Sequence, residues 1–304
     1  MLWYDDTAKN AAKNAAKYVA KKAEYGLRQI MQAAVPVLLA ACFMTAAPVA
    51  AMTGSEPASQ LVQHQASYEM TLEYVSPSSE VIGVDGRSSY ALADECSGLA
   101  TSENYLLRFI YDSGDEVTIA SRYQAWEQAD GQLFNFELHE ESSYEPALKL
   151  DGYAMLGEGD SEKGEAYFSI EPTQAMPIPS DTLFPVSHLL ALLEKARKGE
   201  RQFSAKIFFG AEPDRALKTA VAFISDKKQR QGQGFDHVLI QTEYWPVRIA
   251  YFDPSSGAPE PDYEVMLELQ ENGLVAGYAI DYGDLVIRAN LRSLESKPAA
   301  DCSS

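Results

Sequence analysis

Basic residues are scarce in this chain, and their scarcity excludes several classes of partner. The 304 residues include 25 Lys and Arg against 44 Asp and Glu, which gives a formal net charge of −19. Because nucleic-acid binding needs a basic surface, nucleic acid is excluded as a partner. Peripheral binding to anionic lipid head groups is disfavoured for the same reason. The charge serves solubility, or it attracts a basic protein or a bridging divalent cation.

Motifs that would organise a metal ion or a nucleophile are also missing. No HxH, HxxxH or HExxH spacing occurs among the four histidines, which are His64, His139, His188 and His237. There is no Gly-x-Ser-x-Gly elbow either. Asp112–Glu116 could bind Ca²⁺ weakly, but its composition is more typical of a hairpin turn. Residues 157–164 resemble a phosphate loop, but they are acidic and lack the terminal Lys-Ser/Thr. We therefore expect no enzyme, no cofactor and no metal site.

Long apolar runs are confined to the N-terminal region. Residues 31–51 are apolar and end in small residues, so we expect a signal peptide over residues 1–51, cleaved between Ala51 and Met52. The basic stretch before the run is unusually long, which suggests a start site placed too early. Without residues 1–51, which hold six of the basic and three of the acidic residues, the net charge is −22. A signal peptide predicts a periplasmic protein, with no stable membrane span once the signal peptide has been cleaved.

Cysteine is rare, and its interpretation depends on whether the signal peptide is removed. The sequence has Cys42, Cys96 and Cys302. Leu39–Cys42 resembles a lipobox, so lipidation of Cys42 is an alternative, although the residues after it stay apolar. If Cys42 leaves with the signal peptide, Cys96 and Cys302 form an even pair. In an oxidising compartment such a pair favours one disulfide, with two unrelated thiols as the alternative.

Strand patterns fill most of the remaining sequence. After a polar linker over residues 52–60, alternating apolar segments rich in Tyr and Phe recur at short spacing through a single domain over residues 61–304. Asp130–Gly131, Asn272–Gly273 and Tyr282–Gly283 predict tight antiparallel connections, and Asp85–Gly86 predicts a bulge or turn. We expect an all-β fold, a single large antiparallel sheet of a dozen or more strands.

One internal helix is predicted near residues 182–198. Asp181 or Ser187 could cap its start, and Gly199 suits the position after its end. His188 lies beside the apolar stripe of leucines, so we interpret it as a packed histidine rather than a catalytic base. The leucines are expected to face the sheet.

Aromatic residues at strand spacing allow two interpretations. They are Trp126, Phe134, Phe136, Trp245, Tyr251 and Phe252. Packing in the core is the simpler one. The alternative is that they line a groove that binds a glycan, a lipid or a peptide.

Short motifs along the chain, taken in order, resemble one family. They are Leu61–Tyr68, Cys96-x-Gly98, Trp126–Phe136, Leu183–His188, Trp245–Asp253, Pro261–Glu264, Glu271–Gly273 and Asp281–Gly283. This set is similar to the EipB-type cell-envelope integrity proteins of alphaproteobacteria. The resemblance covers roughly residues 61–302.

The resemblance implies a secreted periplasmic protein with a spiral-like β architecture and a disulfide at the positions of Cys96 and Cys302. It also implies a role in envelope integrity and stress resistance without an established enzymatic activity. A periplasmic tetratricopeptide-repeat protein is a possible partner by the same resemblance. Our first hypothesis is a non-catalytic protein that binds a protein partner or an envelope component. The second is a periplasmic carrier of a lipid or other apolar ligand, and the third is a hydrolase without a recognisable motif.

Overall fold

The fold is known from a computed structural model, which describes residues 61–144, 146–157, 163–169, 174–210, 213, 215–230, 237–298 and 301–302. The expected signal peptide over residues 1–51 with Cys42, its expected cleavage site between Ala51 and Met52, and the linker over residues 52–60 lie outside the described residues. So do residues 158–162 of the glycine-rich segment.

Strands dominate the described chain. The first eight are β1 (His64–Val75), β2 (Val81–Asp94), β3 (Gly98–Tyr111), β4 (Glu116–Gln128), β5 (Leu133–Ser142), β6 (Leu148–Met155), β7 (Gly164–Phe168) and β8 (Gln174–Ile178). After β9 (Thr182–Leu183) and helix α2 (Pro185–Arg197) come β10 (Gln202–Phe208), β11 (Leu217–Ile224), β12 (Lys228–Gln229), β13 (Glu243–Phe252), β14 (Tyr263–Leu269), β15 (Val275–Asp281) and β16 (Leu285–Ser296).

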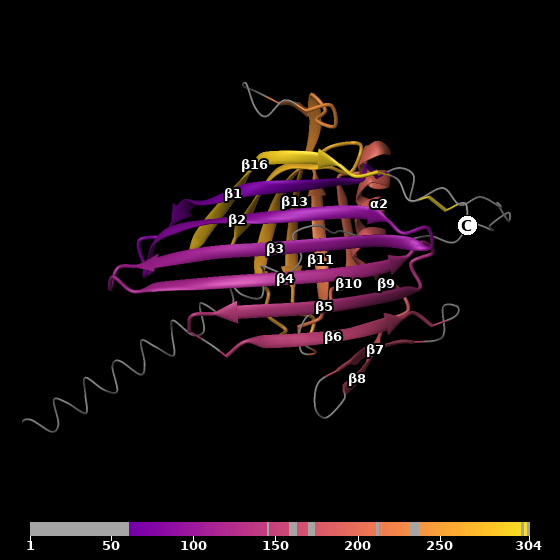
Figure 1. Ribbon diagram of the computed structural model, residues 1–304, viewed down its shortest axis with the longest axis horizontal. Coiled ribbons are helices and arrows are strands. Elements are labelled where there is room, and N and C mark those ends of the chain that lie inside the picture. The colour runs from indigo at the N-terminus through magenta and orange to yellow at the C-terminus, as the bar shows by residue number, and fades with distance from the viewer. Residues whose placement is uncertain are drawn as a thin grey trace, which may run out of the picture.

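These strands form one continuous sheet. Its order is β8-β7-β6-β5-β4-β3-β2-β1-β16-β15-β14-β13-β11-β10-β9, and β12 pairs with β13 off this path. The ladder between β9 and β10 is parallel, and the other ladders of the described strands are antiparallel. Figure 1 shows β2 to β6 crossing the view as one layer, with β10, β11 and β13 behind it at a steep angle. The predicted all-β fold is confirmed, with α2 as the one helix of the described residues, and the sheet curls into a nearly closed, barrel-like form.

The core lies between the two layers and is rich in aromatic residues. Along β4, buried and accessible side chains alternate, as expected for a strand with one face on the core. Phe134, Phe136 and Phe208 belong to a cluster in which the rings of Phe134 and Phe184 stack with centroids 5.0 Å apart. Such ring pairs add to the free energy of burial. Phe134, Phe136, Trp245 and Tyr251 are buried, as the simpler interpretation proposed, whereas Trp126 and Phe252 are only half-buried.

Helix α2 lies where it was predicted, but its start differs. It begins at Pro185 with Phe184 as N-cap, and no side chain of the cap residue bonds to the helix. The expectation that Asp181 or Ser187 caps it is wrong: Ser187 lies within the first turn, and the Asp181 carboxylate accepts a bond from the Lys206 ammonium. Residues 182–183 form β9 instead, because they pair with β10.

The other end of the helix follows the prediction. Gly199 has a φ of +72°, the left-handed conformation that glycine favours after a helix. Leu189, Leu192 and Leu193 are buried in the core, so the leucines face the sheet as expected. Among the described residues, no helix is long and apolar enough to cross a membrane.

The hairpin predictions hold, and one bulge prediction does not. Asp130–Gly131 joins β4 to β5, and Gly131, Gly273 and Gly283 all have positive φ. Asp85–Gly86, in contrast, lies within continuous β2, paired with β1 and β3. Close packing explains why glycine occupies position 86, because an added Cβ would lie 2.2 Å from the carbonyl oxygen of Leu106.

Candidate surface grooves on the outer face of the sheet

The outer face of β3 to β7 carries two neighbouring rows of side chains. The ladder register places Trp126 opposite Asn135, Asn135 opposite Tyr153, and Tyr153 opposite Tyr167. The adjacent row runs through Ser102, Gln124, Glu137 and Asp151. Because successive side chains in a strand alternate between faces, both rows point away from the core.

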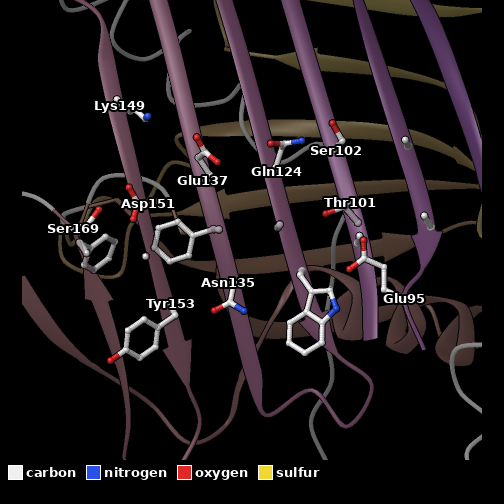
Figure 2. A pocket seen from close by; sticks show the side chains of 18 of the residues that line it. Glu95, Thr101, Ser102, Gln124, Asn135, Glu137, Lys149, Asp151, Tyr153 and Ser169 are labelled. Carbon is white, nitrogen blue, oxygen red and sulfur yellow. The ribbon is translucent and has the colours of Figure 1, made fainter. Parts of the chain in front are cut away.

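These rows line a groove of about 900 Å³, which we call the aromatic groove. Figure 2 shows Gln124, Glu137 and Asn135 on one side of the sheet, projecting from adjacent strands. Tyr153 is 39% exposed, and its ring stacks on Tyr167 with centroids 5.0 Å apart. The groove thus combines flat aromatic surfaces with amide, hydroxyl and charged groups.

Glycine shapes the bottom of this groove. Gly152 lies between Phe136 and Phe168 in the ladders of β5, β6 and β7. A Cβ at Gly152 would lie 2.5 Å from the Phe136 ring, so these strands can pack this closely only around a glycine. Phe136 and Phe168 also line the groove, which therefore reaches the core at this point.

One edge of the aromatic groove is acidic and ordered by a hydrogen bond. The Tyr167 hydroxyl donates to Glu165 at 2.5 Å. This bond raises the pKa of Tyr167 above its ordinary value, because the carboxylate accepts from the protonated phenol. Glu137 and Asp151 supply acceptors to the groove, and Lys149 supplies a donor.

A second groove of about 750 Å³ lies beside the first on the same face, and we call it the arginine groove. Its lining includes Arg87, Arg122, Arg292, His139, Glu69, Glu141, Ser67, Ser89 and Asn104. Arg292 pairs with Glu69, and Nε2 of His139 lies 3.3 Å from Glu141. Asn104 donates to the Ser89 hydroxyl at 3.2 Å.

The predicted cysteine pair is brought together. The Sγ atoms of Cys96 and Cys302 lie 2.08 Å apart, at a Cα separation of 5.6 Å and across 206 positions of sequence. Cys96 has a φ of +62°, a left-handed conformation that is uncommon for residues other than glycine. Formation of this bond in the cell stays a prediction, which thiol titration tests.

The four histidines lie on different parts of the chain, with His237 between β12 and β13. His188 is fully buried on α2, with both ring nitrogens lacking a hydrogen bond among the described residues. Burial lowers its pKa well below the ordinary value. His64 is buried on β1, where Nδ1 lies 2.7 Å from the Val62 carbonyl, and His139 lines the arginine groove. No group of three or more metal-binding side chains occurs in the described part of the chain.

The groove residues were mostly missed by sequence analysis. Trp126 belonged to the aromatic set and Asn135 to the motif Trp126–Phe136, but nothing in the sequence distinguished Tyr153, Arg87 and Arg122 from other residues in strands. Their only signal is their place at outward-facing positions of alternating strands. The register of several successive strand ladders decides which of these side chains become neighbours.

The fold and the grooves define a class of protein: an all-β protein built on one barrel-like sheet that presents polar and aromatic grooves on its outer surface. Comparison with known proteins agrees with the fold of this class. The crystal structure of a β-barrel-like protein of a domain of unknown function from Brucella abortus has a TM-score of 0.69 and 25% sequence identity. The match covers 78% of this chain and 99% of that one.

Sequence comparison identifies the family. The model of EipB-like proteins matches residues 55–298, so the chain belongs to the EipB-like family, as the short motifs indicated. It is 28% identical over 247 residues to the cell envelope integrity protein EipB of Brucella abortus (strain 2308). That alignment covers 78% of this chain and 84% of the relative.

Proposed function

We propose that this protein supports the integrity of the cell envelope without catalysis, by binding a sugar-containing envelope component in the aromatic groove. Its relative from Brucella abortus carries the name cell envelope integrity protein, which supports the envelope role. The observation that carries the binding proposal is the row formed by Trp126, Asn135, Tyr153 and Tyr167 on the accessible face of the sheet.

The chemistry of the groove suits a glycan. Tyr153 and Trp126 offer flat surfaces against which the C–H faces of sugar rings can pack. Asn135 and Gln124 carry both donors and acceptors, which match the hydroxyl groups of a saccharide. A lipid carrier, our second hypothesis, would need a more apolar lining than one containing Glu137 and Asp151.

The cellular setting follows from the same proposal. A signal peptide over residues 1–51 would deliver the protein to the periplasm, where cell-wall and surface glycans are within reach. Lipidation at Cys42 is the alternative route to the envelope. A tetratricopeptide-repeat protein remains a candidate partner, and crosslinking in living cells followed by identification of the captured proteins tests it.

A complementation experiment tests the groove. A strain lacking the gene is transformed with the wild-type gene, with the double variant Asn135→Ala/Tyr153→Ala, or with Tyr74→Ala as a control. Tyr74 is 51% exposed on β1 and does not line either groove. We expect the wild type and the control to restore resistance to detergent, and the double variant to fail at equal protein levels.

Binding and turnover are measured on purified protein. Calorimetric titration with neutral oligosaccharides such as maltotetraose should show binding that the double variant loses at least tenfold. Full complementation by the double variant would contradict the proposal. Release of cleaved products from envelope glycans, abolished by a single substitution, would contradict its non-catalytic part.

A further inference from the structure

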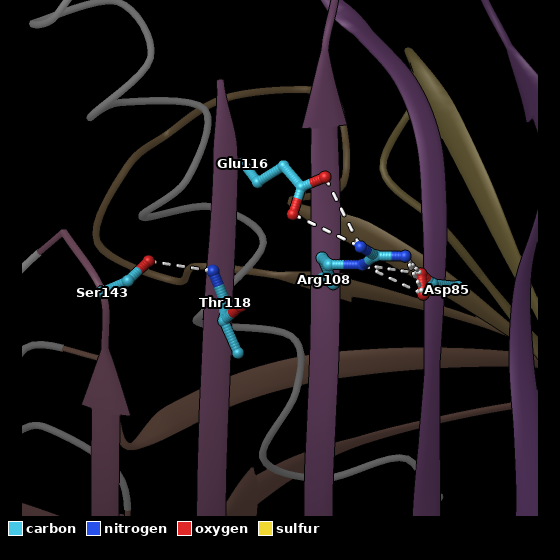
Figure 3. Close-up of polar contacts among 5 residues, drawn as sticks. All are labelled: Asp85, Arg108, Glu116, Thr118 and Ser143. Atoms are coloured by element: carbon cyan, nitrogen blue, oxygen red, sulfur yellow. Dashed lines mark hydrogen bonds and ion pairs between the residues drawn. The ribbon is translucent and has the colours of Figure 1, made fainter. Parts of the chain in front are cut away.

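Two arginines on the outer face differ from the other arginines around them. Arg87 and Arg122 are exposed, and within the described part of the chain neither forms an ion pair with a carboxylate. Arg108 on the same face shows the usual arrangement: it binds Asp85 at 2.9 Å and Glu116 at 3.3 Å, as Figure 3 shows. Arg292 is likewise paired, with Glu69.

The absence of carboxylate partners is notable in so acidic a chain. Acidic residues outnumber basic ones by 44 to 25, so the composition alone favours a carboxylate partner for every exposed arginine. The arginine groove nevertheless contains Arg87, Arg122 and Arg292 against Glu69 and Glu141, a net charge of +1 with His139 neutral. The groove is thus a local positive site on a protein whose overall charge is −19.

The ladder register places polar groups beside the free guanidinium groups. Ser67, Ser89, Asn104, Arg122 and His139 follow one another across β1 to β5 in a single row. Arg87 lies in the next row of the same face, since it stands opposite Glu69 in the register of the ladder between β1 and β2. Hydroxyl and amide donors next to guanidinium groups are a setting suited to an oxyanion.

This row also adjoins the aromatic groove. Asn104, Arg122 and His139 each lie two residues along their strands from Ser102, Gln124 and Glu137 of the aromatic groove. A two-residue step along a strand is about 7 Å, so the two grooves are close enough for one short chain of sugar rings to reach both. A short oligosaccharide can therefore extend from one groove into the other.

We propose that the arginine groove binds the carboxylate or phosphate groups of an acidic oligosaccharide whose sugar rings occupy the aromatic groove. The inference rests on the proposed function and adds the charge of the ligand to it. Arginine suits this role because its planar guanidinium binds carboxylate and phosphate oxygens in pairs. The acidic remainder of the surface repels dense polyanions, so the groove selects ligands with few, spaced negative charges.

Calorimetric titration with matched probes tests the inference on the purified protein. The carboxylate arm compares tetragalacturonate with its uncharged methyl ester, and the phosphate arm compares phosphorylated maltotetraose with maltotetraose. We expect at least one charged probe to bind at least tenfold more tightly than its neutral counterpart. The arm with the larger preference identifies the anionic group.

Variants assign that preference to the groove. Arg87→Gln/Arg122→Gln should remove the preference for the charged probe and leave the affinity for the neutral probe within twofold. Arg108→Gln removes an arginine from the same face that is already paired and does not line this groove, so it should retain the full preference. Raising the salt concentration should weaken binding of the charged probe alone.

The outcomes separate the inference from the proposed function. If the double arginine variant keeps the full preference, or if the wild type shows none, the arginine groove is not the anion site. In that case a loss of neutral-probe binding in Asn135→Ala/Tyr153→Ala still supports the aromatic groove. If that substitution changes neither probe while the arginine substitutions remove charged binding, the proposed function fails and the anion site stands.

Discussion

The carboxylate of Glu127 accepts a hydrogen bond from the backbone N–H of Val186 at 2.6 Å, and a second from the N–H of Ser187 at 2.8 Å. The Ser187 hydroxyl donates to the same carboxylate. Glu127 thus satisfies the free N–H groups at the start of α2, where the helix dipole favours a negative charge. Glu127 directly follows Trp126 on β4. The same strand therefore lines the aromatic groove through Trp126 and binds the start of α2 through Glu127.

Glu127 should make stability depend on pH. Burial raises its pKa to about 7, although the hydrogen bonds from Ser187 and Val186 act in the opposite direction. The folded protein therefore binds more protons than the unfolded chain between pH 4.5 and 7, and the stabilisation linked to this proton is lost as pH rises through 7.

Glu127→Gln replaces the carboxyl group with an amide that does not titrate, so the difference in stability between the wild type and the variant should change with pH. Relative to the variant, the wild type should gain up to about 3 kcal/mol in free energy of unfolding as the pH falls from 8 to 5. Urea denaturation of both proteins across this range measures the difference. Glu95→Gln, at an exposed position before β3, is the control. A difference that stays constant with pH would contradict the raised pKa.

His188 should act on stability in the opposite direction. Burial depresses its pKa, so the folded protein binds fewer protons than the unfolded chain, and stability falls as pH drops below 6.5. His188→Leu keeps the site apolar and removes this effect. We expect the free energy of unfolding of the variant to lie within about 1.5 kcal/mol of the wild-type value at pH 7.5. At pH 5 the stability of the variant should have risen relative to that of the wild type. Thermal unfolding at both pH values measures this, and an equal shift at both would count against it.

Cys96 and Cys302 should form a disulfide in protein isolated from the periplasm. A loop of this length corresponds to roughly 5 kcal/mol in chain-entropy models, and the measured effect is commonly smaller. Cys96→Ser, Cys302→Ser and reduction of the wild type should each lower the unfolding temperature. Thiol titration of the denatured, unreduced protein should find neither of these thiols free; two free thiols would rule out the bond.

Gly86 should tolerate no side chain. A Cβ at this position would lie 2.2 Å from the Leu106 carbonyl oxygen, which is fixed in the ladder between β2 and β3. Gly86→Ala is expected to cost about 3 kcal/mol of stability, because the strands must separate. Gly277→Ala on β15 is the matched control, since its Cβ would have its nearest contact at 3.4 Å. Equal stability of the two variants in urea denaturation would contradict this reading of β2.

Local patterns predicted much of the fold and little of the site. The hairpin at Asp130–Gly131 and the helix end at Gly199 were predictable because glycine with positive φ is a local signal. The helix start was not, because its capping group, Glu127, lies about 60 positions earlier on another strand. The same limit applies to Gly86, whose role depends on the partner strand rather than on its neighbours in sequence.

Alternation of apolar and polar residues was enough to establish an all-β chain, because each strand carries that information within a few residues. The order of short motifs was enough to indicate the family. Only the folded sheet could show that Trp126, Asn135 and Tyr153 form one row, or that among the described residues Arg122 has no carboxylate partner of the kind that binds Arg108. These relationships depend on the register of several antiparallel ladders, and a shift of one residue in any ladder would place a different set of side chains in the grooves.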